Sequence, residues 1–502
     1  MEESLQNILD QQRELSTLGG IAALLGWDQM TYMPPQGTTA RSQQSALLSR
    51  LSHERVVSDT LWHHLQQLSQ HTTFKRLAEH EQIIVTRLQK DVEKARKIPS
   101  SFVERFSKVT TLAYPSWQQA RATNKYSLFA PHLTQIIELE KEYCGYIDLP
   151  GPLYNTLLDD YEEGITVDVL QREFQRVKQR LKQLLERLST SNFYDPKKEF
   201  TLPLPPNKQR ELCTFVKDAL MLPPDRSRMD VSTHPFTTAL DIDDVRITTN
   251  FDRNNSLFSF FSTIHESGHA LYELGMPQQE YKDTVISDSP SLGMHESQSR
   301  FWENMIARNE SFWHWLHPHL KKIIPGQLSH LAPEELYRGV NQVRPSLIRV
   351  EADELTYGLH VILRFDLELA LLEDSLDVKD LPEVWKEKME EFLGLRPATD
   401  TEGVLQDMHW SGGSIGYFPT YLIGSIYAAQ LFHQLKQDHP SIEEDIQQGT
   451  FSPILTWLRD HVHRYGRMMT ADDIIQRTCG EGLNAERYLT YLEGKYCTLY
   501  DV

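Results

Sequence analysis

The residues best suited to chemistry in this sequence are the two histidines and the glutamate of His265-Glu266-Ser267-Gly268-His269. Side chains four residues apart on a helix lie about one turn apart on the same face, so the two imidazoles can bind one divalent metal ion. Glu266 is too close to the first histidine to bind the same metal well, but it is placed to act on a nearby water molecule. This arrangement is typical of zinc peptidases.

The residues around this motif predict that it lies within a helix. Asn254-Asn255-Ser256 offers a polar N-cap, and Gly275 offers a stop. Between them, apolar residues recur at helical spacing at Leu257, Phe258, Phe261 and Ile264. We therefore expect an apolar helix that presents both histidines to a buried site, because polar side chains buried without partners are costly.

A catalytic zinc site normally has a third protein ligand and an open position for water. Two adjacent residues, His295 and Glu296, are candidates for this ligand, and residues 294–302 read as another helix after a break at residues 290–293. Neighbouring residues on a helix point about 100° apart, so only one of the two can face the metal. Spacing alone does not decide between them. Two histidines and a carboxylate suit Zn²⁺, although Co²⁺ fits the same ligands.

The composition describes a chain that can bury a large core and that carries a strong negative charge. It has 502 residues, with 51 Lys and Arg against 70 Asp and Glu, and a net charge of −19. This charge argues against nucleic-acid binding, which needs a basic surface. Mean hydropathy is −0.47, and no apolar run approaches the roughly 20 residues of a membrane helix, so we expect no membrane partner.

The cysteines and the N-terminus indicate the compartment. The cysteines are Cys144, Cys213, Cys479 and Cys497, with no CxxC pair among them, and we expect them to be reduced. The first residues, Met1-Glu2-Glu3-Ser4, are acidic where a secretory signal is basic, and no apolar signal core follows. We predict a cytoplasmic protein.

The apolar pattern predicts an N-terminal helical lobe over residues 1–200, with helices in stretches such as residues 81–97 and 170–188. Proline-rich segments follow, and we expect residues 201–502 to form the catalytic region, in one structural unit with the first lobe. Residues 244–249 alternate polar and apolar side chains and are the best candidate for a strand. As an edge strand beside the metal helix it would pair with an extended peptide; the alternative is an ordinary structural hairpin.

Further motifs give the chain a resemblance over almost its whole length to the carboxypeptidase Taq family of HExxH metallocarboxypeptidases. Besides the pentapeptide, they occur in this order: Trp27-Asp28 with Met33-Pro34, His234-Pro235-Phe236, Asp244-Val245-Arg246-Ile247-Thr248, His295-Glu296-Ser297-Gln298, Ile348-Arg349-Val350-Glu351-Ala352-Asp353, Gly403-Val404-Leu405-Gln406-Asp407-Met408-His409-Trp410 and Gly416-Tyr417-Phe418-Pro419-Thr420-Tyr421. The one small departure is Asn250, where a basic residue is common in the family.

The resemblance implies a fold, an activity and a ligand set. The implied fold is mainly α, a neurolysin-like two-lobed helical structure with a deep groove and a small β-sheet near the active site. The implied activity is the removal of single residues from the C-terminus of peptides, with broad specificity, by a homodimer. In that family the Glu of the HES-Q motif is the third metal ligand, which implies Glu296 here and leaves His295 as its neighbour.

The motifs also supply candidates for the catalytic chemistry. We expect Glu266 to act as the general base, taking a proton from the attacking water and delivering it to the leaving amine. Tyr417 is the first candidate for the hydrogen-bond donor to the developing oxyanion, and Tyr421 is the second; both have the alternative of being packing aromatics. His234 is a further candidate to assist.

An exopeptidase must also recognise the free carboxylate of its substrate. A guanidinium does this well, because its fork matches both carboxylate oxygens. Arg349 is the candidate for this role and Arg246 is the alternative, but Arg349 could instead form a structural ion pair with Glu351 or Asp353.

Two other functions share these sequence features. An endo-acting oligopeptidase on the same scaffold would have every metal motif and a groove open at both ends. A non-catalytic peptide-binding protein would keep the fold without turnover, although the intact Glu266 argues against it.

Overall fold

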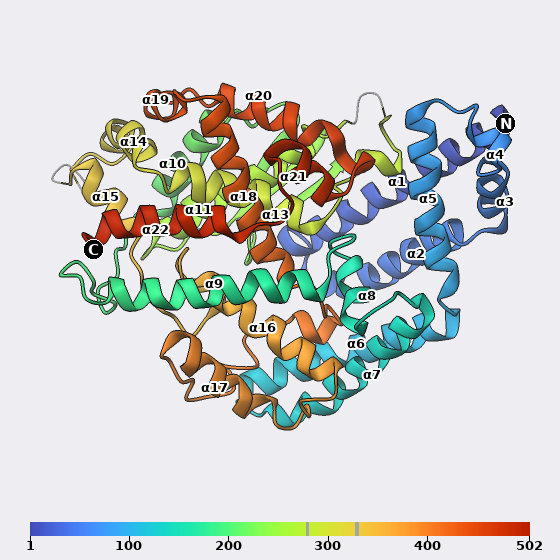
Figure 1. Cartoon of the computed structure of the whole chain (residues 1–502), viewed down its shortest axis with the longest axis horizontal. Helices are drawn as coiled ribbons and strands as arrows, with labels where there is room; N and C mark the ends of the chain where they lie inside the picture. The colour runs from blue at the N-terminus through green and yellow to red at the C-terminus, as the bar shows by residue number, and fades with distance from the viewer. Residues whose placement is uncertain (278–280, 327–330) are drawn as a thin grey trace.

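The computed structural model describes residues 1–277, 281–326 and 331–502, and most of these residues are helical (Figure 1). The α-helices are α1 Glu2–Thr31, α2 Thr38–Val56, α3 Asp59–Leu68, α4 His71–Phe74, α5 Glu79–Lys97, α6 Ser100–Thr123, α7 Ala130–Ile147, α8 Leu153–Asp159, α9 Val167–Leu188, α10 Pro206–Ala219, α11 Ser256–Glu273, α13 Leu292–Arg300, α14 Glu310–Ile323, α15 Pro333–Val340, α16 Tyr357–Leu372, α17 Leu381–Leu393, α18 Pro419–Asp438, α19 Ile442–Gln448, α20 Ser452–His461, α21 Ala471–Cys479 and α22 Ala485–Tyr500.

Shorter helical turns connect several of these helices. They are η1 Pro35–Gly37, η2 Tyr126–Leu128, η3 Val285–Ser287, η5 Arg349–Glu351, η6 His409–Gly412 and η7 His463–Met468, together with a π-helix, η4 Phe301–Ala307. The described residues also form three strands: β1 Ser227–Val231, β2 Thr237–Asp241 and β3 Asp244–Thr249. The predicted fold class, mainly α with a small β-sheet, is confirmed.

The helices predicted from apolar periodicity form where local signals begin and end them. The stretch at residues 170–188 belongs to α9, whose N-cap Thr166 accepts a hydrogen bond from the Val169 amide. Its buried side chains recur every three or four residues, as in Leu170, Phe174 and Val177, so a single stripe faces the core. The stretch at residues 81–97 is α5, which starts two residues earlier than predicted.

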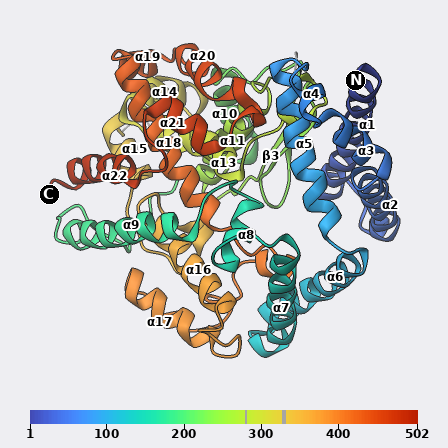
Figure 2. The same cartoon turned by 45° about the vertical axis from the view of Figure 1, so that its right-hand side comes forward.

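Two hydrophobic cores hold the helices together. A small core is made by α1, α3 and α5, and it includes Ile8, Leu65 and Val85. The larger core runs from Ala113 to Tyr500 and therefore crosses the predicted boundary at residue 200. Figures 1 and 2 show α1 to α5 at one end of the molecule and α9 beside α22. The division into residues 1–200 and 201–502 stays a prediction.

The sheet has the order β1-β3-β2, with β1 parallel and β2 antiparallel to β3. The strand predicted at residues 244–249 is β3, but its expected place at a sheet edge is wrong. Because β3 lies between two strands, both of its edges are hydrogen-bonded and it cannot accept a peptide by strand addition. The outer strand β2 is approached by α1, and a Cβ on Gly20 of α1 would lie 2.5 Å from the Leu240 carbonyl oxygen.

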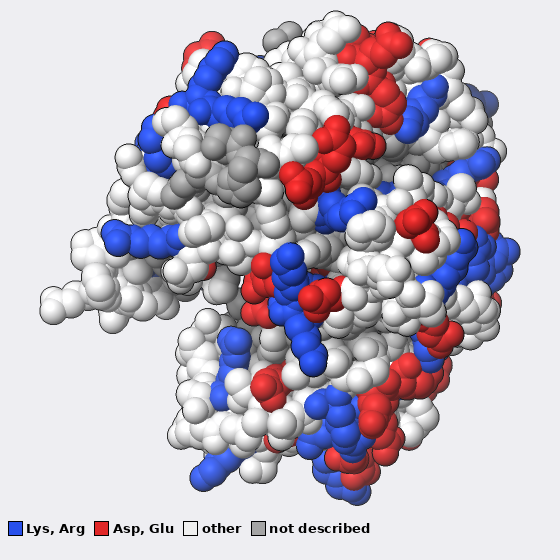
Figure 3. Space-filling view, turned by 90° about the vertical axis from the view of Figure 1, so that its left-hand side faces the viewer, with Lys and Arg blue, Asp and Glu red and all other residues white. Residues whose placement is uncertain are grey.

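The surface carries charges of both signs. On the face drawn in Figure 3, Lys and Arg are interspersed with Asp and Glu, and the outline is notched between an upper and a lower part. Among the described residues, none of the helices combines the length and the apolar character needed to cross a bilayer.

Candidate active site

The HESGH motif lies on α11. The N-cap and the apolar face of this helix are as predicted, except at one position. Asn255 is the N-cap, and its side chain accepts a hydrogen bond from the Leu257 amide at 3.2 Å. Phe258 does not belong to the apolar face, because it is 46% exposed, whereas Phe260 is buried. The reason is the helical repeat, which places Phe260 close to the line of Leu257 and Ile264 and turns Phe258 by about 100° from Leu257.

Two glycines allow the backbones around the motif to approach closely. A Cβ on Gly268 would lie 2.7 Å from the Ser299 Cα and 2.7 Å from the Gln298 carbonyl oxygen, so α11 and α13 touch at backbone level. A Cβ on Gly424 of α18 would lie 2.7 Å from the Cβ and Cγ of Glu296. Glu296 is therefore packed between α11 and α18, on a helix capped by the Ser291 side chain.

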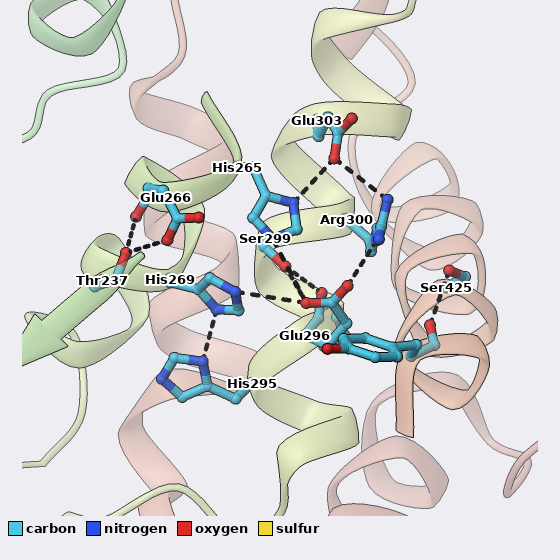
Figure 4. Close-up of polar contacts among 12 residues, drawn as sticks. Thr237, His265, Glu266, His269, His295, Glu296, Ser299, Arg300, Glu303 and Ser425 are labelled. Carbon is cyan, nitrogen blue, oxygen red and sulfur yellow. Dashed lines mark hydrogen bonds and ion pairs between the residues drawn. The ribbon is translucent and has the colours of Figure 1, made fainter. Parts of the chain in front are cut away.

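His265, His269 and Glu296 converge on one point (Figure 4). One oxygen of Glu296, Oε2, lies 3.6 Å from the Nε2 atom of His265 and 3.5 Å from the Nε2 atom of His269. Ligand atoms around a tetrahedral zinc, with bonds of about 2.0–2.1 Å, lie roughly 3.4 Å apart. One ligand atom from each residue lies within 4.8 Å of the others, so the three side chains fit a single divalent ion.

His295 lies on the other side of His269. Its Nδ1 atom is 2.6 Å from the Nδ1 atom of His269, and its Nε2 atom is 2.7 Å from an oxygen of Glu273. The Nε2 atom of His269 therefore stays directed at Glu296, while its other nitrogen is held by a polar chain. Such outer partners fix the orientation of an imidazole ligand.

Glu303 and Arg300 form a second polar layer around the cluster. Glu303 lies 2.9 Å from the Nδ1 atom of His265 and also pairs with Arg300 and Arg308. Arg300 donates to the Oε1 atom of Glu296 at 2.7 Å. Glu303 is on the π-helix η4, a kind of distortion that is frequent at functional sites.

The charges of this layer control the protonation of the histidines and carboxylates. Burial, assisted by His295, lowers the pKa of His269 to about 3, so this imidazole is neutral, as a metal ligand must be. Burial opposes the charge on Glu296, but Arg300 and His265 outweigh it and hold the pKa of Glu296 well below its usual range. Burial also opposes a proton on His265, yet Glu296 and Glu303 raise the pKa of His265. Carboxylates that favour a proton there would equally favour a divalent cation.

The carboxyl group of Glu266 is held apart from the three converging side chains. Thr237 of β2 donates its hydroxyl to the Oε2 atom of Glu266 at 2.7 Å and lies 2.9 Å from the Glu266 carbonyl oxygen. Burial raises the pKa of Glu266. A buried carboxyl group with a raised pKa is suited to take up a proton near neutral pH.

Tyr417 and Tyr421 lie together at the N-terminus of α18, with ring centres 5.3 Å apart. The Tyr421 hydroxyl is 3.3 Å from the Nε2 atom of His409. Burial raises the pKa of both tyrosines, and the Glu296 carboxylate raises each pKa further. Both phenols therefore keep their protons at working pH and lie within electrostatic reach of the three converging side chains.

Arg349 is buried and already paired. Its Nε atom donates to Asp407 at 3.0 Å and its Nη1 atom to the Tyr357 hydroxyl at 3.1 Å, while its guanidinium lies 5.1 Å from the ring centre of Tyr421. Asp407 also pairs with the fully buried Arg364. The ion-pair partner considered in the sequence analysis, Glu351 or Asp353, is therefore wrong.

The remaining two predicted residues lie on or next to the sheet. Arg246 of β3 forms a two-pronged ion pair with Asp244, at 2.7 and 2.6 Å, and stacks on Trp27 with its guanidinium 4.3 Å from the ring centre. His234 is exposed and lies three residues before Thr237, the first residue of β2. Thr237 at the start of this strand is the residue that contacts Glu266.

Comparison with known proteins places this geometry in a family. The pattern of the carboxypeptidase Taq (M32) metallopeptidases matches residues 7–496. The chain belongs to this family. Thermostable carboxypeptidase 1 of Pyrococcus furiosus is 39% identical over 98% of both chains, and carboxypeptidase 1 of Bacillus subtilis is 36% identical over 99% of this chain and 98% of its own.

Solved structures of family members have the same fold. The M32 carboxypeptidase from Deinococcus radiodurans has a TM-score of 0.96 at 36% identity, over 100% of both chains. Metallocarboxypeptidase 1 of Trypanosoma cruzi has a TM-score of 0.93 at 32% identity, over 99% of this chain and 100% of its own. The chain is therefore a metallocarboxypeptidase, which favours the exopeptidase over an endo-acting enzyme or a non-catalytic peptide-binding protein.

Sequence reasoning missed several residues that surround the predicted ones. Arg300 and Glu303 follow Glu296 by four and seven residues, one and two helical turns, so their shared face was readable from the spacing. Arg364 and Glu368 interrupt an apolar helix, and such charged residues are seldom fully buried without partners. Thr237 gave no signal, because its contact with Glu266 depends on how β2 pairs with β3.

Proposed function

We propose that this family member is a zinc-dependent carboxypeptidase that removes single residues from peptide C-termini with broad specificity. The observation that carries the proposal is the convergence of His265, His269 and Glu296 on one point, with the separately held Glu266 beside it. These three side chains would hold Zn²⁺, and Co²⁺ would suit the same donors.

Each residue of the site has its own role in the proposed reaction. The bound metal would polarise the scissile carbonyl and lower the pKa of a water molecule toward about 7. Glu266 takes the proton of the attacking water and passes it to the leaving amine, while Thr237 keeps its carboxyl group in place. Tyr417 donates a hydrogen bond to the oxyanion as it forms, and Tyr421 is the second candidate for this donor.

Recognition of the substrate C-terminus is assigned to Arg349. One carboxylate, Asp407, is shared by Arg349 and Arg364, so these three side chains in contact carry two positive charges and one negative charge, which favours a second anion. Arg246, whose fork is engaged by Asp244, is the alternative. Tyr421, beside Arg349, and the exposed His234 are the further candidates to contact the substrate.

The direction of cleavage tests the proposal. Incubation with a peptide of known sequence should give a ladder that shortens one residue at a time from the C-terminus, and a chelator should stop it. Peptides that differ only in their last residue should all be shortened if specificity is broad. Internal fragments would support the endo-acting alternative, and no turnover by the zinc-loaded protein would support the non-catalytic one.

The anion clamp has its own test. Arg349→Ala should reduce kcat/KM strongly on free-acid peptides and change little on the same peptides with an amidated C-terminus, which wild type should cleave poorly. A lost charge-assisted pair in a desolvated site is worth several kcal/mol, on the order of 10²-fold or more. Equal losses on both substrates would reject Arg349 as the clamp and leave Arg246 to be tested in the same way.

The homodimer and the cytoplasmic location stay predictions. Light scattering after size-exclusion chromatography should give twice the mass of 58.3 kDa for the homodimer. A mass that stays at one chain over a wide concentration range would exclude it.

A further inference from the structure

A buried carboxylate outside the predicted site, Glu368, is bonded on all sides. It projects from α16 and accepts hydrogen bonds from the Tyr154 hydroxyl at 2.6 Å, the Trp410 indole nitrogen at 2.6 Å and the Gly416 amide at 3.0 Å. Burial raises the pKa of Glu368 to about 7, and these three donors together with Arg364 offset part of that cost. None of its surface is exposed.

Two of these donors mark the two ends of one short segment. Trp410 uses the Oε1 atom of Glu368, and Gly416 uses the Oε2 atom. The segment includes two glycines with positive φ, Gly413 at +78° and Gly416 at +88°. The carboxylate therefore fixes both ends of residues 410–416, a segment that contains three glycines.

Helix α8 packs against the same segment at Gly416. A Cβ on Gly416 would lie 3.0 Å from the Leu157 Cβ and 3.1 Å from the Leu157 carbonyl carbon. Tyr154, the third donor to Glu368, is on the same helix one turn earlier. Gly416 is thus fixed between the backbone of α8 and the carboxylate of α16.

Tyr417 is the next residue after this fixed point. Its ring meets Tyr161 edge-on, with centres 5.4 Å apart, and lies 5.3 Å from the ring of His409, the residue just before the segment. The position of its hydroxyl is therefore set by the backbone at Gly416, by these aromatic neighbours and by a hydrogen bond with Tyr421.

We propose that Glu368 is a positioning residue for Tyr417: by holding Trp410 and Gly416 it keeps the Tyr417 hydroxyl where the oxyanion develops. This inference rests on the proposed role of Tyr417. Glu368 touches neither the substrate nor the metal ligands, and it acts only through the segment that it holds.

The substitution Glu368→Gln removes this function with little change of shape. An amide presents one oxygen and one NH₂ group, whereas the carboxylate presents an oxygen to an N–H group on each side. In either orientation the NH₂ group must face the N–H of Trp410 or that of Gly416. One end of the segment is therefore released, while the amide oxygen keeps the other end bonded.

A double-mutant cycle with Tyr417→Phe tests the proposal. Loss of one oxyanion donor costs about 10²–10³ in kcat, and misplacement of a catalytic group by about 1 Å costs roughly 10²-fold. Glu368→Gln should therefore lower kcat on the order of 10–100-fold, with KM and bound metal nearly unchanged. In the Tyr417→Phe background it should add less than about threefold, because the hydroxyl that it positions is already gone.

Glu162→Gln is the matched control. Glu162 is also a buried carboxylate with three donors: Ser291 at 2.8 Å, the Gly293 amide at 2.9 Å and the Tyr427 hydroxyl at 3.4 Å. These donors belong to α18 and to the start of α13, and none of them lies in residues 410–416. The effect of Glu162→Gln on kcat, whatever its size, should multiply with that of Tyr417→Phe. Should Glu368→Gln not fold, Tyr154→Phe removes one donor to the same carboxylate and enters the same cycle.

The outcomes separate the two proposals. If Tyr417→Phe loses at least about 10²-fold in kcat and Glu368→Gln multiplies with it, Glu368 merely supports the fold and the positioning role is rejected. If Tyr417→Phe turns over within about threefold of wild type, Tyr417 is not the donor, and the role of Glu368 is rejected with it.

Discussion

Replacing Gly268 by alanine should weaken metal binding without changing any residue of the proposed ligand set. The added Cβ would lie 2.7 Å from the Ser299 Cα and from the Gln298 carbonyl oxygen, about 0.7 Å inside the 3.4 Å at which ordinary contact begins. Both obstructing atoms are backbone atoms. The methyl group therefore cannot be accommodated by a side-chain rotation, and α11 and α13 must move apart.

The size of that movement sets the expected effect. His265 and His269 are on α11 and Glu296 is on α13, so a separation of roughly 0.7 Å changes the two His–Glu distances of 3.6 and 3.5 Å directly. Metal–ligand distances tolerate about 0.2 Å. We expect metal affinity to fall about 10–100-fold, as for other disturbances of a ligand's support, and the free energy of unfolding to fall by about 1–3 kcal/mol from overpacking.

Competition with a chelating dye would measure the affinity, and thermal unfolding of the metal-free protein would measure the stability. Gly494→Ala is the matched control, because this glycine is also helical and its Cβ would meet nothing within 4 Å. It should stabilise the protein by about 0.5–1 kcal/mol and leave metal affinity unchanged. A Gly268→Ala protein with wild-type metal affinity would refute the argument that contact between α11 and α13 sets the metal site.

Three further predictions concern single side chains. Glu266→Gln should keep the metal and the fold while kcat falls by at least about 10²-fold, because an amide cannot accept the water's proton; near-native turnover would remove Glu266 from the reaction. Elemental analysis should find that Glu296→Ala loses metal and His295→Ala largely keeps it, and the reverse result would exchange their roles. Burial opposes the charge on Glu303, but His265, Arg300 and Arg308 outweigh burial and lower the pKa of Glu303 from 4.5 to about 2. The ionised carboxylate therefore stabilises the folded protein above about pH 4.5, and this stabilisation is lost as the pH falls toward 2. The metal-free Glu303→Gln protein should therefore lose less melting temperature than wild type between pH 5 and pH 3, and equal losses would contradict this assignment.

Local signals were enough to predict the helices that carry the site. The N-cap at Asn255 and the apolar stripe before His265 lie within a few residues of one another, and both act in the isolated segment. The arrangement of the sheet was not readable in the same way. β1, Ser227–Val231, buries its polar Asp230 and leaves Val231 39% exposed, which is the reverse of what its sequence suggests. The central place of β3 therefore depends on pairing with a segment 18 residues earlier in the chain.

The partner of Arg349 shows why pairing across the chain escapes sequence reasoning. Glu351 is exposed, and Asp353 accepts the backbone amides of Leu355 and Thr356, where it caps the next turn. Neither is available to a buried guanidinium. Asp407, 58 residues away, is supplied by a segment that also hydrogen-bonds the Arg349 amide through Gln406.

The hydrogen bonds of Glu296 bear on how open a bound metal would be. Arg300 occupies one oxygen of this carboxylate at 2.7 Å, while the other oxygen faces both histidines. A carboxylate held in this way would offer a metal one oxygen rather than two. Three protein atoms would then bind the ion, which leaves the position for water that distinguishes a catalytic zinc site from a closed structural one. Arg300 therefore belongs to the proposed chemistry although it contacts neither metal nor substrate, because loss of its hydrogen bond would free the second oxygen of Glu296 to compete with water.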